Sequence, residues 1–458
     1  MSAVTARTPS RLRESARRTF LIATTDTGED AWPHTTRVLP WLLAGFLAML
    51  WLLPFRAIYL PGVGNPDRPA LVAIAGLWLA ALAVVQGAAR PRVQVTRLHA
   101  AISAFFVCAV ASVALNTDVL ANLGELGLAS KKLVLLASYA AFFILVGSVI
   151  RPAEIPRFVG LVLGLATIVS VAAIVEYRFE VNPFYDLAAN LAYTVAPSDL
   201  HEIDPTGRTT VYGPMDHPLE LALMLALVLP FALVPMLEEA RHSYRLRWLL
   251  LTGVLLAGVF VTQRKTGLIA AGVGALAVLA LRPRAVRRAV PLGIGLMLIL
   301  HLVAPGAMGS LRQQLEPTRL TSTKSIGDRS DDYDAIVPDL LRHPALGRGY
   351  GSYEPYKYRI LDNQYLGLLV TVGFVGTAAY GLLLLTAMAS ARRPVPGARP
   401  LPARQIAAPI AAVAAFAVGG ALFDVLAFPH VTYSFFFLLG LVAAARAGPH
   451  SNPTSRGG

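Results

Sequence analysis

Long runs of apolar residues, separated by short polar segments, fill most of the chain. A run of roughly 17 or more mostly apolar residues is long enough to cross a bilayer as a helix. About twelve runs approach or exceed this length, at residues 38–55, 69–88, 98–116, 132–150, 157–176, 218–237, 247–263, 266–282, 288–304, 364–387, 406–428 and 431–446. The pattern predicts an all-α fold, a polytopic transmembrane helix bundle with about 12 spanning helices.

The polar segments predict how the chain is divided. In chain order we expect a disordered cytoplasmic tail over 1–37, helices one to nine over 38–304, a large external loop over 305–363, helices ten to twelve over 364–446, and a cytoplasmic tail over 447–458. A second external loop is expected near 177–217. Long loops often carry binding and catalytic residues, although they are also tolerated as plain insertions.

Composition favours a membrane as the surrounding solvent. Hydrophobic residues make up 55% of the 458 residues and charged residues only 15%. The mean hydropathy of +0.58 is too high for a water-soluble fold. The formal net charge of +13 does not indicate a nucleic-acid partner, because the basic residues lie in short clusters between the apolar runs.

The distribution of Lys and Arg predicts the orientation of the helices. Cytoplasmic segments of membrane proteins are enriched in these two residues. One alternating set of segments, which includes both tails, carries 24 of the 40 Lys and Arg residues. Half of the other 16 lie in the loop over 305–363, whose length weakens the rule. Both termini are therefore predicted to be cytoplasmic and the two long loops external.

The sequence shows no motif that would hold a metal or a cofactor. Cys108 is the sole cysteine, so the chain has neither an internal disulfide nor a Cys-x-x-Cys zinc pattern. No phosphate-binding P-loop and no Rossmann glycine fingerprint occur. Four aspartates between residues 328 and 334 lack the glycine and glutamate of an EF-hand loop. We expect a solvated acidic turn there, no metal and no cofactor.

Basic side chains stand at two places on the predicted external side. Arg208 lies in the Gly- and Pro-containing segment Thr206–Pro218, which leads into the sixth helix. Arg264 and Lys265 form most of the turn between helices seven and eight. A guanidinium group suits a phosphate or diphosphate ligand. The alternatives are ordinary solvation for Arg208 and anchoring at the lipid headgroups for the other two residues.

The large external loop contains a glycine-rich motif. Apolar residues between 336 and 341 have the spacing of a short amphipathic helix. Gly347, Gly349 and Gly351 then alternate along the chain, with Tyr350 between the last two. Such glycines permit close approach of the backbone and could present amide groups to an anionic or sugar ligand.

Asp362 and Asn363 stand at the start of the tenth predicted helix. Both residue types are favoured as helix caps. A carboxylate at a helix start is stabilised by the free amides and by the helix dipole, but it can also act as a general base. The sequence leaves these two roles of Asp362 open.

The order of these features resembles the O-antigen ligase/polymerase superfamily of polytopic glycan-assembly proteins. The likeness covers roughly residues 205–380. Its most specific parts are Arg329, Pro344–Gly351, Asp362–Tyr365 and Gly373–Gly376. The resemblance implies a glycosyltransferase of the bacterial cytoplasmic (inner) membrane that takes glycan from an undecaprenyl-diphosphate carrier on the external face. Its partners would be the lipid-linked oligosaccharide donor, a glycan acceptor, membrane lipids and other polysaccharide-assembly proteins.

The resemblance also implies roles for single residues. The external arginines of the family are held to engage the diphosphate, and here they are Arg208 and Arg264. Further substrate contacts are expected from residues in or beside the same motifs, namely Lys265, Arg329, Gly349, Tyr350 and Asn363. Ligases of the family typically have a histidine directly before the asparagine, where this chain has Asp362. We therefore expect Asp362 to be the catalytic base of a polymerase rather than of a ligase.

Two other classes of function remain open. A small-solute or anion transporter should show inverted repeats and charged or broken helices near the midplane. The clearest ionic residues here gather instead at the predicted external boundary, and His301 and Asp424 are the exceptions. The second alternative is a non-catalytic membrane partner in an envelope-assembly complex.

Overall fold

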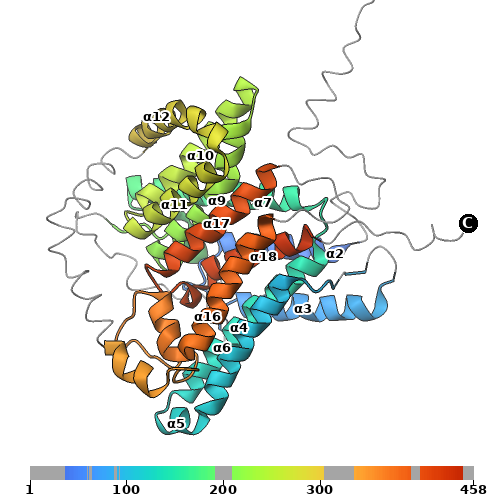
Figure 1. The fold of residues 1–458 in the computed structure, drawn as a ribbon. Coiled ribbons are helices and arrows are strands. Elements are labelled where there is room, and N and C mark those ends of the chain that lie inside the picture. The colour runs from blue at the N-terminus through green and yellow to red at the C-terminus, as the bar shows by residue number, and fades with distance from the viewer. Residues whose placement is uncertain are drawn as a thin grey trace, which may run out of the picture.

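The computed structural model describes residues 37–58, 60, 64–86, 90–91, 93–190, 209–303, 335–392 and 403–446. In these ranges the chain is helical and has no strand, only isolated bridge residues such as the Leu60–Gly64 pair (Figure 1). A described helix coincides with each predicted run: α2 (Val38–Leu52), α3 (Asp67–Val84), α4 (Arg97–Leu115), α6 (Leu126–Val149), α7 (Ile155–Phe179), α9 (Pro218–Glu238), α10 (His242–Val261), α11 (Lys265–Leu281), α12 (Val286–Val303), α16 (Gln364–Arg392), α17 (Ala403–Gly420) and α18 (Pro429–Ala444). The predicted all-α fold is confirmed.

The described helices that are long enough to cross a membrane are fewer than the predicted spans. Among the described residues, seven helices are long and apolar enough to cross a membrane, namely α3, α4, α6, α7, α9, α10 and α16. An eighth span results if α11 and α12, which are bent by 105° at their junction, count as one. Three more apolar helices, α2, α17 and α18, are shorter. A polytopic helix bundle is confirmed, and the count of 12 spans stays a prediction.

The eleventh predicted helix extends too far toward the C-terminus. We predicted a helix through residue 428, but α17 ends at Gly420 and is followed by a turn and the 3-10 helix η3 (Val425–Ala427). Phe423 and Leu426 in this connector are buried, so hydropathy alone cannot separate it from a helix. Asp424 therefore lies between helices and not inside one. The side chain of His301 lies outside the described part of the chain.

Small residues let the other helices approach α9 closely. Most of α9 is buried inside the bundle. In its most apolar stretch of 18 residues 83% of the residues are buried, against 17% in that of α3. Gly267 of α11 leaves so little room that an added Cβ would lie 2.4 Å from Ala222. Gly419 of α17 would likewise meet Leu223 at 2.6 Å. Close contact of this kind is the usual basis of helix association in membranes, and it makes α9 the central helix.

Contacts between distant segments show that several helices begin at the same end of the bundle. Gly267 and Ala222 bring together the starts of α11 and α9. A Glu220–His430 contact joins the starts of α9 and α18. The backbone N–H of Leu426 donates to the side chain of Gln364 at 2.8 Å, which brings in the start of α16. We call this end, where α9, α11, α16 and α18 begin, the predicted external end.

The long helix α16 is broken at Gly373, which has φ 64° and ψ −167°. A helical chain would pair the N–H of Phe374 with the carbonyl of Val370 four residues earlier. Here the N–H of Phe374 donates instead to the carbonyl of Pro344 at 2.9 Å, and the carbonyl of Val370 accepts from Arg348 at 3.0 Å. Both groups freed by the break are thus paired with the loop over residues 344–351, which we call the glycine loop.

The next residue pair along α16 repeats the same exchange. The N–H of Val375 donates to Ala345 at 3.1 Å, and the carbonyl of Thr371 accepts from Gly349 at 3.0 Å. Gly347 has φ 67°, and an added Cβ would lie 2.3 Å from the backbone of Thr371. The glycines of this loop therefore let its backbone enter the break in α16.

We expect Gly347→Ala to destabilise the protein, because the new Cβ meets backbone at a positive φ. The loss should be on the order of 2 kcal/mol or more, measured as the thermal unfolding midpoint in detergent. Gly381→Ala in the second half of α16 is the matched control, since an added Cβ there meets no heavy atom within 4 Å. Equal midpoints for the two variants would contradict the role of the loop.

Candidate functional site

Arg264 and Lys265 stand in the tight turn that leads from α10 into α11. Gln263, the residue before them, has φ 56°, a left-handed conformation that is uncommon for residues with a side chain. Strain of this kind persists where surrounding structure fixes the backbone. The contact of Gly267 with Ala222 then holds the first turn of α11 against α9. The two cations are thereby placed at the predicted external end.

Asn363 provides cap hydrogen bonds at the start of α16. The side-chain oxygen of Asn363 accepts from the backbone N–H of Tyr365 at 2.9 Å and of Leu366 at 3.3 Å. Asp362 directly precedes this cap and is exposed. Asn363 therefore fulfils the capping role that the sequence predicts for this pair.

Gly349 and Tyr350 pack inside the protein at the glycine loop. Gly349 lies against Leu120, which an added Cβ would approach to 2.8 Å. Tyr350 is buried, and its ring meets Phe105 edge-on with centroids 6.3 Å apart. The amides of residues 347, 348 and 349 all donate to carbonyl groups of this chain. The expected presentation of loop amides to a ligand is therefore wrong for these three.

Arg348 holds a buried cluster of charges that sequence reasoning did not single out. Its guanidinium group donates to Glu125 at 2.8 Å, to Asp339 at 3.2 Å and to the Tyr358 hydroxyl at 2.5 Å. Lys357 lies 2.7 Å from Glu125. Burial alone would raise the pKa of the Glu125 carboxyl, but the hydrogen bonds from Lys357 and Tyr358 and the charge of Arg348 lower it. This cluster joins the glycine loop to the segment before α6.

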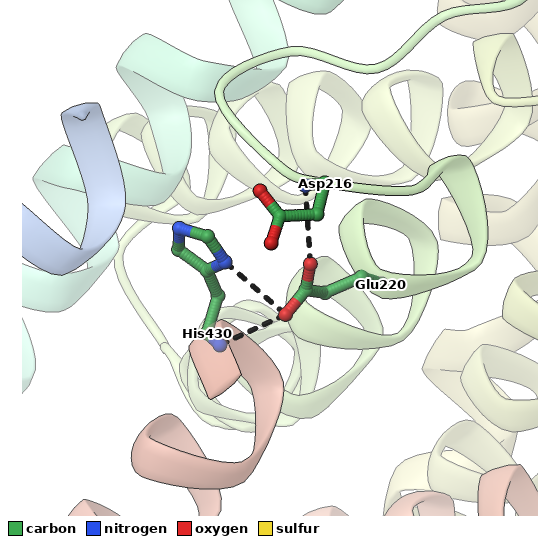
Figure 2. A group of neighbouring side chains, drawn as sticks. All are labelled: Asp216, Glu220 and His430. Carbon is green, nitrogen blue, oxygen red and sulfur yellow. Dashed lines mark hydrogen bonds and ion pairs between the residues drawn. The ribbon is translucent and has the colours of Figure 1, made fainter. Parts of the chain in front are cut away.

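A second cluster lies where α9 meets α18 (Figure 2). The buried Glu220 carboxylate accepts from the backbone N–H of His430 at 2.8 Å, of Val431 at 3.4 Å and of Asp216 at 3.2 Å, and lies 3.2 Å from Nδ1 of His430. The residue that precedes α18 makes no side-chain cap bond. Glu220 thus caps α18 from a different helix, where a negative charge also complements the helix dipole.

Among the residues that the structure describes, the same cluster is the group that could hold a metal ion. Ligand atoms of Asp216, Glu220 and His430 lie within 4.8 Å of one another. However, N–H groups already surround both oxygens of Glu220, and Asp216 accepts from the backbone of Arg56 at 3.1 Å. Burial raises the pKa of Asp216, partly against the charge of His430. The hydrogen bonds offset part of the cost of burying these two carboxyl groups.

Glu176 holds the segment that follows Arg208 in the chain. Its carboxylate accepts from the backbone N–H of Tyr212 at 3.0 Å and of Gly213 at 2.8 Å, and from Asn182 at 2.9 Å. In the sequence, a glutamate at the end of an apolar run indicates only that a helix ends there, so this role could not be predicted. Arg208 and Arg329 lie outside the described residues.

The described candidates are brought to the predicted external end from separate elements. Arg264 and Lys265 come from the start of α11, Asp362 and Asn363 from the start of α16. The contacts that link these starts run through α9 and the segment before α18. Gly349 and Tyr350 have a different role, because they pack the glycine loop against helices.

Part of the chain that carries these residues is similar to a known protein family. Residues 250–381 match the family model described as O-antigen ligase. This match to part of the chain is what links the protein to the O-antigen ligase/polymerase superfamily. The matched segment includes Arg264, Lys265, the glycine loop, Asp362 and Asn363, and the relationship supports a membrane enzyme of the O-antigen ligase type. None of the curated proteins matches the chain.

We expect Glu125→Gln to destabilise the protein by about 3 kcal/mol, because the buried Arg348 would lose its most buried carboxylate partner and keep only Asp339. Lys357→Met is the control, since the Lys357 side chain is 39% exposed and its ion pair should contribute much less to stability. Thermal unfolding in detergent measures both. A smaller effect for Glu125→Gln than for Lys357→Met would refute the assignment.

Proposed function

We propose that the protein transfers undecaprenyl-diphosphate-linked glycan to a glycan acceptor on the external face of the cytoplasmic membrane, as a polymerase. One observation carries the proposal. The segment related to O-antigen ligases contains a pair of cations and a carboxylate, and both stand at helix starts of the same end of the bundle. Orientation of that end toward the outside follows from the Lys and Arg distribution.

The proposed reaction needs a base and a stabiliser of negative charge. The Asp362 carboxylate takes the proton of the acceptor hydroxyl while that oxygen bonds to the anomeric carbon of the donor glycan. The bond between this carbon and the diphosphate oxygen breaks, and undecaprenyl diphosphate leaves with the electron pair. Arg264 and Lys265, together with Arg208, offset the charge that develops on the leaving diphosphate.

The residue before Asn363 favours a polymerase over a ligase. Ligases that resemble this chain typically carry a histidine there, and this chain carries Asp362. Asn363 already accepts hydrogen bonds from two of the first amides of α16, so its side chain suffices as the cap. An exposed carboxylate beside a fixed helix start is suited to meet a sugar hydroxyl.

The break in α16 does not favour the transporter alternative. Broken helices in transporters offer unpaired backbone groups to an ion or a substrate. At Gly373 the carbonyls of Val370 and Thr371 and the N–H groups of Phe374 and Val375 are all paired with the glycine loop. They are therefore occupied.

We expect Asp362→Asn to lower the rate of glycan transfer by roughly 100-fold or more, because an amide cannot accept the proton. Transfer of lipid-linked repeats by purified protein in proteoliposomes measures this rate. Asn363→Ala separates catalysis from capping, since it should lower the unfolding midpoint by the equivalent of about 1 kcal/mol, whereas Asp362→Asn should leave that midpoint unchanged. Full activity of Asp362→Asn would exclude its role as the base.

We expect Arg264→Ala and Arg208→Ala each to reduce transfer in the same assay by at least roughly tenfold, because each removes a charge-assisted contact to the diphosphate. Arg392→Ala is the control, since Arg392 lies at the opposite end of α16 from Asp362. Undiminished transfer in both arginine variants would exclude the proposed contact of these arginines with the diphosphate.

A further inference from the structure

An apolar cavity of about 450 Å³ lies between α9, α10 and α11. This volume is within the range of roughly 300–1,000 Å³ that ligand pockets occupy. Its walls are formed mainly by aliphatic side chains, with Leu229 and Leu233 from α9 and Leu256 from α10 among them. Thr252 is polar, but its hydroxyl donates to the carbonyl of Trp248 at 2.7 Å. The walls therefore offer a ligand almost only apolar contact.

The cavity opens to the side of the bundle. Ile269 and Gly272 of α11 line it, and both are exposed. The exposed fraction of Ile269 is 46%. In a bundle that spans a membrane, a lateral opening of this kind faces the lipid. A hydrocarbon chain can enter it without crossing water.

A single cation marks one end of the cavity. Lys265 is the charged residue among the side chains that line it. Within the described part of the chain, the side chain of Lys265 makes no hydrogen bond and no ion pair. It is also the first residue of α11, whose start has no side-chain cap bond. The free amides and the helix dipole add to the positive potential there.

The length of the cavity fits one leaflet of a bilayer. Its lining residues on α11 run from Lys265 to Ala275. At a rise of 1.5 Å per residue this is roughly 15 Å, about half of the roughly 30 Å hydrocarbon core. An occupant would thus place its charged head at the membrane boundary beside Lys265 and its chain in the external leaflet.

We propose that this cavity binds the first part of the prenyl chain of a lipid diphosphate, with the diphosphate at Lys265. The proposal rests on the proposed function for the identity of the lipid. Arg264 stands next to Lys265, and two adjacent cations complement two phosphate groups better than the single phosphate of a bilayer phospholipid. The cavity would hold the donor, or the carrier released from it, close to the turn where charge is stabilised.

Binding of farnesyl diphosphate to the purified full-length protein in phosphatidylcholine nanodiscs tests the proposal. Gly272→Leu fills the cavity, and an added Cβ at Gly272 meets no heavy atom within 4 Å, so the side chain has room to enter. Gly164→Leu on α7 is the matched control, because Gly164 is an exposed glycine with the same free space and does not line the cavity. Ile269→Trp is a second filling variant.

We expect Gly272→Leu and Ile269→Trp to weaken binding of farnesyl diphosphate about tenfold or more, whereas Gly164→Leu binds as the wild type does. Inorganic diphosphate, which has no chain, should bind Gly272→Leu as it binds the wild type and should bind Lys265→Ala more weakly. Wild-type affinity of both filling variants for farnesyl diphosphate would overturn the proposal. Loss of binding when phosphatidylglycerol is added to the nanodiscs would also overturn it, since an ordinary anionic lipid would then fill the cavity.

Glycan transfer by the same preparations separates this proposal from the proposed function. If the wild type binds farnesyl diphosphate through the cavity but transfers no lipid-linked repeats, the polymerase function fails and the lipid site stands. If the wild type transfers repeats and the filling variants bind farnesyl diphosphate normally, the polymerase function stands and the lipid site fails.

Discussion

A backbone N–H or carbonyl group that is left unpaired in apolar surroundings costs several kcal/mol. Helices avoid this cost along their length, but each start, end and break leaves groups without partners. In this protein the groups at two such places find partners in distant segments. Glu220 of α9 accepts from the first amides of α18, and the glycine loop pairs with the break in α16.

These long-range pairings gather at the end of the bundle that carries the proposed chemistry. The start of α11 brings Arg264 and Lys265, and the start of α16 brings Asp362. Neither start is positioned by its own sequence alone, because each depends on contact with α9 or with the segment before α18. Catalytic groups on rigid helix ends keep their geometry better than groups on unsupported loops. The buried clusters around Glu220 and Arg348 therefore act as supports for the site.

Local sequence features predicted the helices well and the tertiary contacts poorly. Every predicted apolar run coincides with a helix of the structure, because lipid and the protein interior both select apolar residues. The run through residue 428 misled us, since the connector with Phe423 and Leu426 is as apolar as a helix. The partners Glu220 and His430 are separated by 210 residues and Arg348 and Glu125 by 223. No local pattern encodes such pairs.

The candidate site was predictable only as far as its motifs are local. Arg264, Lys265, Asp362 and Asn363 stand out because charged and polar residues are rare beside apolar runs. The glycine loop also stood out, but we attributed its glycines to ligand binding. The left-handed Gly373 that receives the loop lies inside an apolar run and looks like any small helix residue. The apolar cavity between α9, α10 and α11 leaves no sequence motif at all.

The pairing of the glycine loop with α16 also limits how the chain can vary in length. Two consecutive loop carbonyls, of Pro344 and Ala345, meet two consecutive amides of the helix, and the amides of Arg348 and Gly349 return to two consecutive carbonyls. An inserted or deleted residue between 344 and 349 shifts one set against the other. Changes in length before residue 335 leave both sets aligned. Relatives of this chain should therefore keep the length between Pro344 and Gly349 and differ in loop length outside it.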